Sequence, residues 1–114
     1  MTASKQATVV INIGRDYSPI PFGRYRSDGK YSAEKFRDDI LIPAMRNNKL
    51  VIIELDDVRM SYGSSFLEET FGGLIRRGFS SREILEKIEI RTELSDYRTE
   101  IQNYISRAEQ AVAH

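Results

Sequence analysis

The sequence predicts a single domain of the α/β class, because strand patterns and helix patterns alternate along the chain. Runs of β-branched and apolar residues indicate three strands, at residues 7–14, 50–55 and 87–91. Apolar residues at helical spacing fill the segments between and after them. Alternation of this kind favours a layered fold with a partly parallel sheet and right-handed crossovers.

The bulk composition is that of an ordinary globular domain. The chain has 114 residues, of which 40% are hydrophobic and 30% charged, so one core can form without disulfides. Lys and Arg number 17, as do Asp and Glu, and the formal net charge is zero. This balance removes the usual electrostatic signal for nucleic acid or an anionic membrane. We therefore expect a protein partner, and neither nucleic acid nor a membrane.

Two absences narrow the chemistry. The chain has no cysteine, which excludes disulfides, thiolate metal sites and cysteine nucleophiles. Its single histidine is the last residue, His114, so neither a Ser–His mechanism nor a histidine metal site is expected. We predict no enzymatic activity, no metal and no cofactor. Without a signal-peptide pattern or a long apolar run, a cytoplasmic protein is expected, with a flexible N-terminus at 1–6 and the domain at 7–112.

The first strand, 7–14, is followed by a segment rich in proline and glycine that predicts turns. Within it we expect a short strand at 22–26 and a turn at Asp28-Gly29. Ser32 is then expected to cap a helix. Pro43 should kink or end this helix nearby, and Asn47-Asn48 mark its exit.

The nearly continuous apolar run at 50–55 predicts a central strand covered on both faces. A helix is expected after Ser65. Its Gly72-Gly73 pair, which costs about 1 kcal/mol per glycine relative to Ala, indicates a tight contact or a helix break. Gly78 is expected to cap its end.

The remaining elements are a short helix, an edge strand and a long helix. Ser80 and Glu83 have the spacing of a capping box, and they predict a short helix. The alternating residues 87–91 predict a short strand near an edge. A final helix is expected from 94 to 112, with Ser95 as its cap.

The loop at 58–65 joins the central strand to the following helix, a place where regulatory and binding groups often lie. Its Ser64 and Ser65 are candidate phosphoacceptors on an exposed turn. The alternative interpretation is that a serine hydroxyl caps the helix. Partner-binding candidates in the same stretch are Tyr62, Gly63, Phe66, Glu68 and Glu69. The alternatives are that Phe66 is a core residue and that Glu68 and Glu69 stabilise a helix N-terminus.

A second candidate site lies in the segment before the first helix. Arg24, Arg26, Asp28 and Arg37 are candidates for binding an anion or a nucleotide phosphate, because arginine forks match phosphate oxygens. On a strand, Arg24 and Arg26 would point to one face. The alternative is surface charge paired with nearby aspartates.

Two motifs carry a family resemblance. Residues 63–69 with Phe71-Gly72-Gly73-Leu74, together with residues 23–29 and the residues that follow them up to Ala44, resemble the STAS-like domain family of undefined function. That family is distantly similar to anti-anti-sigma factor STAS domains. The resemblance implies a small mixed sheet with helices mainly on one face.

The resemblance also implies a function. A histidine-kinase-like ATPase phosphorylates a serine at the start of a helix in anti-anti-sigma factors, and Ser64 matches that serine. Gly63 stands where those factors have Asp, and Phe66 where they have Gly. The expected function is a non-enzymatic regulatory module of bacterial-type signalling that binds such an ATPase through the Ser64 loop and helix. The alternative is an anion-binding, nucleotide-binding or homodimerising module that uses the Arg24-Arg26-Asp28 segment.

Overall fold

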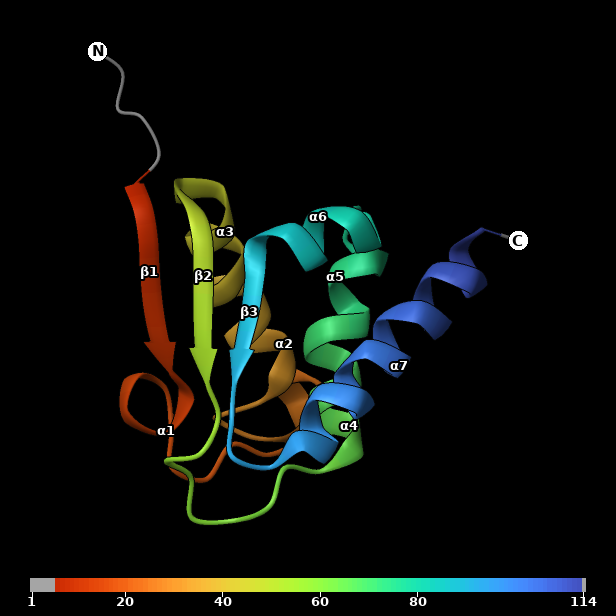
Figure 1. Ribbon diagram of the computed structural model, residues 1–114. Helices are drawn as coiled ribbons and strands as arrows, with labels where there is room; N and C mark the ends of the chain where they lie inside the picture. Colours follow the sequence, from red (N-terminus) through yellow and green to blue (C-terminus); the bar gives the residue numbers. More distant parts are fainter. Residues whose placement is uncertain (1–5, 114) are drawn as a thin grey trace.

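Three parallel strands form the sheet of the protein, in the order β1-β2-β3 (Figure 1). The computed structural model describes residues 6–113. Within it β1 spans Gln6–Asn12, β2 Asn48–Glu54 and β3 Ile88–Arg91. The α/β class and all three predicted strands are confirmed, with β2 central and β3 at an edge. The prediction of a flexible N-terminus falls on residues 1–5, which lie outside the described residues, and on Gln6, which begins β1.

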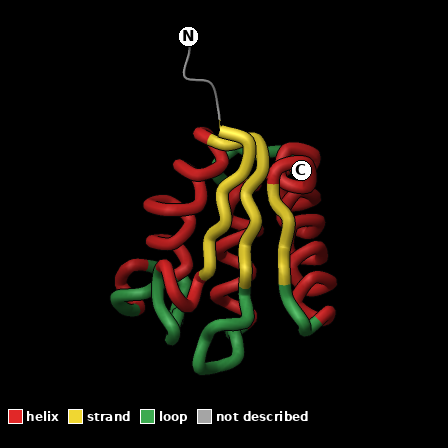
Figure 2. Tube along the Cα trace, turned by 60° about the vertical axis from the view of Figure 1, so that its left-hand side comes forward, coloured by secondary structure: helices red, strands yellow, loops and turns green. Residues whose placement is uncertain are grey.

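Every pair of described strands is parallel, so this part of the chain has no antiparallel pair of the kind that a mixed sheet contains. Both crossovers step across the sheet in the same direction. Right-handed crossovers of this kind place their helices on one face. In Figure 1 the helices of the first crossover lie behind the strands. Figure 2 shows most loops gathered at the carboxyl ends of the strands.

The open face of the sheet corrects one expectation. Val51, Ile53 and Leu55 are fully buried beneath the helices, as a central strand requires. On the other face Val10 is 41% exposed, and Ile52, which lies between β1 and β3, is 8% exposed. The central strand is therefore covered by helices on one face, not on both. An apolar run indicates burial, but it does not say whether helices or neighbouring strands provide it.

The first crossover is a continuous helix with a wide turn in its middle. It consists of α2 (Ala33–Phe36), a π-helical turn (Arg37–Leu41) and α3 (Ile42–Asn47). Ser32 Oγ accepts from the Lys35 N–H at 3.3 Å, which confirms the predicted cap. The helix ends at Asn47, as predicted. Pro43 does not end it: the proline lies in the first turn of α3, just after the wider π turn that ends at Leu41.

The segment before this helix is irregular. A short helix, α1 (Ile13–Asp16), follows β1, and a 3₁₀ turn spans Arg26–Asp28. The predicted strand at 22–26 is wrong. The Asp28 carboxylate accepts from the N–H groups of Arg24 and Tyr25, at 3.0 and 2.8 Å, and so takes up donors that a strand would give to a neighbour.

The second crossover begins with another helix that has a π turn. It consists of α4 (Ser64–Leu67), a π-helical turn (Glu68–Gly72) and α5 (Gly73–Arg76). Gly78 follows with a φ of +105°, a conformation that favours glycine after a helix end. The short helix α6 spans Ser81–Lys87, and Ser80 and Glu83 form the predicted capping box in front of it.

The last helix, α7 (Ser95–Val112), packs against the helix of residues 64–76 (Figure 1). Its predicted apolar stripe is confirmed by the burial of Ile101, Ile105 and Ala108. Leu94, not Ser95, holds the cap position, and no side chain caps this helix. None of the helices within residues 6–113 has the length and apolar character needed to span a membrane.

Candidate functional site

The helix after β2 is capped by Gly63, which precedes both candidate serines. Gly63 holds the cap position with extended backbone angles, a φ of −73° and a ψ of 150°, and offers no side-chain bond. Ser64 and Ser65 are already helical, and both are exposed. The interpretation of a serine as the helix cap is therefore wrong. Neither hydroxyl is committed to closing the helix end, so both are accessible to a modifying enzyme.

A surface groove of about 560 Å³ brings the two candidate segments together. One wall carries the serines at the start of α4, and the other is the irregular loop before the first helix. The lining residues are Pro21, Phe22, Gly23, Arg24, Tyr25, Asp28, Gly63, Ser64, Ser65 and Phe66. Neither segment predicts the other from sequence, because they are about 40 residues apart and meet only through the fold. We call this feature the serine groove.

Exposed apolar side chains surround the serine groove and the loops beside it. Phe22 is 63% exposed and Tyr25 is 49% exposed, and both line the groove. Ile20 and Met60 are also exposed on adjoining loops, which are joined by a bond from the Arg59 N–H to the Pro19 carbonyl. Sequence reasoning did not identify this surface. The sequence did contain a signal for it, namely apolar residues inside a proline-rich and glycine-rich segment, where turns leave side chains exposed.

Tyr62 and Phe66, two of the partner-binding candidates, are instead parts of the core. Tyr62 is 7% exposed, and its hydroxyl donates to the Leu55 carbonyl at 2.7 Å. Its ring meets that of Tyr97 edge to face, with 5.3 Å between centroids. Burial raises the pKa of Tyr62 well above its ordinary value. This corrects the expectation that Tyr62 contacts a partner, because the ring closes the loop onto α7.

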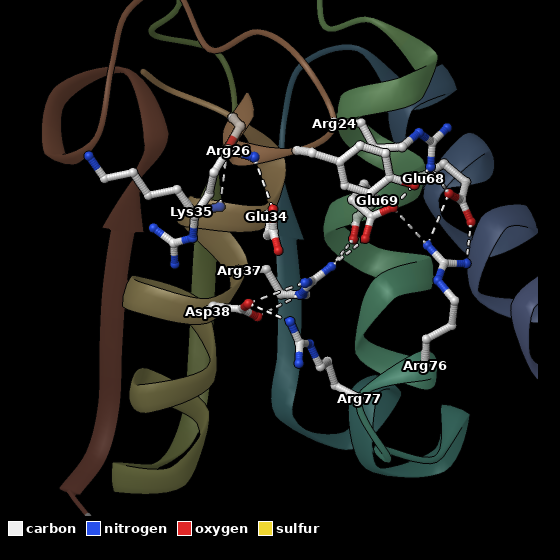
Figure 3. Close-up of polar contacts among 12 residues, drawn as sticks. Arg24, Arg26, Glu34, Lys35, Arg37, Asp38, Glu68, Glu69, Arg76 and Arg77 are labelled. Atoms are coloured by element: carbon white, nitrogen blue, oxygen red, sulfur yellow. Dashed lines mark hydrogen bonds and ion pairs between the residues drawn. The ribbon is translucent and has the colours of Figure 1, made fainter. Parts of the chain in front are cut away.

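Glu68 and Glu69 face arginines of the same chain (Figure 3). Glu68 pairs with Arg24 and with Arg76, the latter at 2.9 Å. Glu69 is buried and accepts from Arg37 at 2.6 Å, with further contacts to Arg24 and Arg76 at 3.1 and 3.2 Å. The two carboxylates therefore tie the irregular loop to two helices. They do not form a free acidic surface for a partner.

The arginine candidates do not converge on one anion site. Arg24 turns toward Glu68 (Figure 3). Arg26 instead pairs with Asp39, at 2.8 Å. The expectation that both point to one face is wrong, because the segment is not a strand. Arg37 is only 3% exposed and is held by Asp38 as well as by Glu69.

The ion pair between Arg24 and Glu68 favours the charged form of both side chains. The hydrogen bond to Glu68 raises the pKa of Arg24. Burial alone would raise the pKa of Glu68, but hydrogen bonds from Arg76 and Arg24 outweigh it and lower that pKa. These shifts are those expected of an ion pair, in which each partner favours the charged form of the other.

The paired glycines allow a close helix contact around this network. A Cβ on Gly73 would lie 2.2 Å from Nη1 of Arg37, and one on Gly72 would lie 2.5 Å from Oε2 of Glu68. The predicted tight contact at Gly72-Gly73 is thus confirmed. The helix is not broken there.

Comparison with known proteins adds a family. A family model described as a STAS-like domain of unknown function (DUF4325) matches residues 32–97. The match begins at Ser32, the cap of the first helix, includes β2, the Ser64 helix and β3, and ends in the first turn of α7. Neither the curated proteins nor the solved structures gave a significant match.

Proposed function

The chain belongs to this STAS-like family, and from that premise we propose that it is a non-enzymatic regulatory module in the cytoplasm. It binds a protein partner of the histidine-kinase-like ATPase type at the serine groove. Phosphorylation of Ser64 or Ser65 switches this binding.

The observation that carries the proposal is the pair of exposed serines in a groove rimmed by exposed aromatic residues. Aromatic side chains on a surface are favoured anchors of protein interfaces, and Phe22 and Tyr25 offer two of them. A phosphate on either serine would add close to two negative charges beside these anchors. Phosphorylation therefore changes the charge of the surface that the partner touches.

The phosphorylation step is tested by intact mass. The purified protein is incubated with ATP and a purified histidine-kinase-like ATPase. We expect the mass gain of one phosphate, lost in either Ser64→Ala or Ser65→Ala and kept in Ser80→Ala. No gain in mass, together with unchanged ATPase binding by Ser64→Asp, would exclude the switch.

The docking step is tested separately by calorimetric titration of the same ATPase. Phe22→Ser should weaken binding by tenfold or more, because it removes an aromatic anchor from the groove rim. Leu85→Ser is the matched control, since Leu85 is similarly exposed, at 61%, but lies on α6 outside the groove. Equal effects of the two substitutions would contradict the assigned surface.

A further inference from the structure

The two edges of the sheet differ in which backbone groups they leave open. The Leu55 N–H donates to the Arg91 carbonyl on β3. Backbone groups of successive strand residues point to alternate sides, so the N–H and C=O groups of the even-numbered residues of β2 point toward β1. Val9 is in register with Val51, and a residue in a parallel pair bonds to the two neighbours of its register partner. The odd-numbered residues of β1 therefore face β2. Thr8 and Val10 point their N–H and C=O groups away from the sheet.

The β3 edge is closed by the protein itself. The outward carbonyls of Ile90 and Thr92 accept from the Arg98 guanidinium, both at 3.2 Å. The outward N–H of Ile88 donates to the Ile84 carbonyl at the end of α6. A covering arginine and a short strand are common protections of a sheet edge.

The β1 edge has no such protection within the described residues. Residues 6–12 contain no charged residue and no proline, the two residue classes that most often block strand addition. Asp16 takes the outward N–H of Asn12, at 2.8 Å, but no described group takes those of Thr8 and Val10. Val10 is also exposed beside the open face of the sheet. An open, uncharged strand of this kind is a site for strand pairing.

We propose that β1 pairs antiparallel with β1 of a second copy of the chain, which joins two sheets into one of six strands. With a two-fold axis at Val9, Thr8 lies opposite Val10 of the other copy. The backbone N–H and C=O groups of both residues point away from their own sheet. Each Thr8–Val10 pair between the two copies can therefore exchange two backbone hydrogen bonds. A second copy fits because the pairing is self-complementary and the formal net charge is zero, so that two copies do not repel each other. This surface is separate from the serine groove, and the inference does not rest on the proposed function.

The first test is the solution mass, measured by light scattering after size exclusion over a range of concentrations. The wild type should approach twice 13.1 kDa as concentration rises. Val10→Pro removes an outward N–H without touching the ladder to β2, so it should remain at 13.1 kDa. Val10→Ala keeps the N–H and should still dimerise. A wild-type chain that stays monomeric, or a folded Val10→Pro chain that dimerises like wild type, would overturn the proposal.

The second test locates the pairing and does not depend on Val10→Pro folding. Opposed residues outside the hydrogen-bonded pairs have Cα atoms about 4.5 Å apart, within the range of a disulfide. The chain has no native cysteine, so Val9→Cys should form a cross-linked dimer when a thiol oxidant is added. Ala7→Cys is the matched control, because position 7 faces position 11 of the other copy and not its own equivalent. Cross-linking of Ala7→Cys but not Val9→Cys would show a different register and contradict the proposed axis.

Discussion

Arg37 and Glu69 form an ion pair inside the protein, with 2.6 Å between Nη1 and Oε2 and side-chain exposures of 3% and 8%. The same Arg37 nitrogen donates to the backbone carbonyl of Glu69 at 3.0 Å. One arginine thus joins the helix of the first crossover to the helix that carries the candidate serines. Arg24, which lines the serine groove, also contacts Glu69, so the ion pair is connected to one wall of the groove.

Loss of one partner of this buried pair should be strongly destabilising. Arg37→Leu leaves the Glu69 carboxylate buried with only Arg24 and Arg76, and a buried charge that loses its partner costs about 3–5 kcal/mol. We expect that reduction in the free energy of unfolding, measured by urea titration. The double variant Arg37→Leu/Glu69→Leu should recover part of it, because no unpaired charge remains. If the double variant were as unstable as the sum of both single variants, this account would be wrong.

The two adjacent glycines should respond differently to alanine. In Gly73→Ala the new Cβ meets Arg37, which is buried and held by ion pairs, so we expect a loss of about 1–3 kcal/mol from overpacking. In Gly72→Ala it meets the end of Glu68, which is partly exposed and able to turn away. A helix gain of about 1 kcal/mol then offsets part of the cost. In thermal and urea unfolding, Gly73→Ala should be less stable than Gly72→Ala. The reverse order of stability would contradict the packing described.

The serines of the groove should be dispensable for folding. Ser64→Ala and Ser65→Ala should change the free energy of unfolding by no more than about 0.5 kcal/mol, because neither hydroxyl caps the helix. Ser80→Ala should cost about 1 kcal/mol, because its hydroxyl accepts from the Glu83 N–H at 3.1 Å in a capping box. Urea titration of the three variants checks both statements. A comparable loss in Ser64→Ala would restore the capping role.

Acid should weaken the fold through Glu68 and Asp38. Burial alone would raise both pKa values, yet both lie below their ordinary values because arginines donate hydrogen bonds to the carboxylates. A carboxylate whose pKa is lower in the folded state stabilises the protein above its unfolded pKa, and this contribution is lost as the pH falls. We expect the free energy of unfolding to decline below about pH 4.5, the ordinary value for glutamate.

The role of Glu68 in this decline is checked by urea titrations from pH 7 to pH 3. Glu68→Gln should show a shallower fall than wild type, since one of the linked protonations is removed. Glu86→Gln is the control, because Glu86 is two-thirds exposed and, within residues 6–113, its ion pair is with Arg82 on the same short helix. Identical pH profiles for Glu68→Gln and wild type would show that Glu68 does not contribute.

The sequence predicts the elements better than it predicts the site. Local patterns identify β2, the Ser32 cap and the Ser80 capping box, because each depends on residues close together in the chain. They do not identify the pairing of Arg37 with Glu69, since two helices must be packed before these side chains meet. The same is true of the serine groove, whose walls come from distant segments. The sequence did not predict the cap at Gly63, because serine is a preferred N-cap residue. In the structure Gly63, the residue before Ser64, has the extended backbone angles of the cap.

The two π-helical turns that hold Arg37 and Glu69 also bear on how the chain tolerates insertions and deletions. A π turn accommodates one more residue than an α turn, and each residue rotates a helix by about 100°. Deleting one residue from either turn would restore α geometry and swing one member of the pair away from the other. Shortening one helix alone therefore breaks the alignment between the two. Length variants that keep a folded domain should change both helices together.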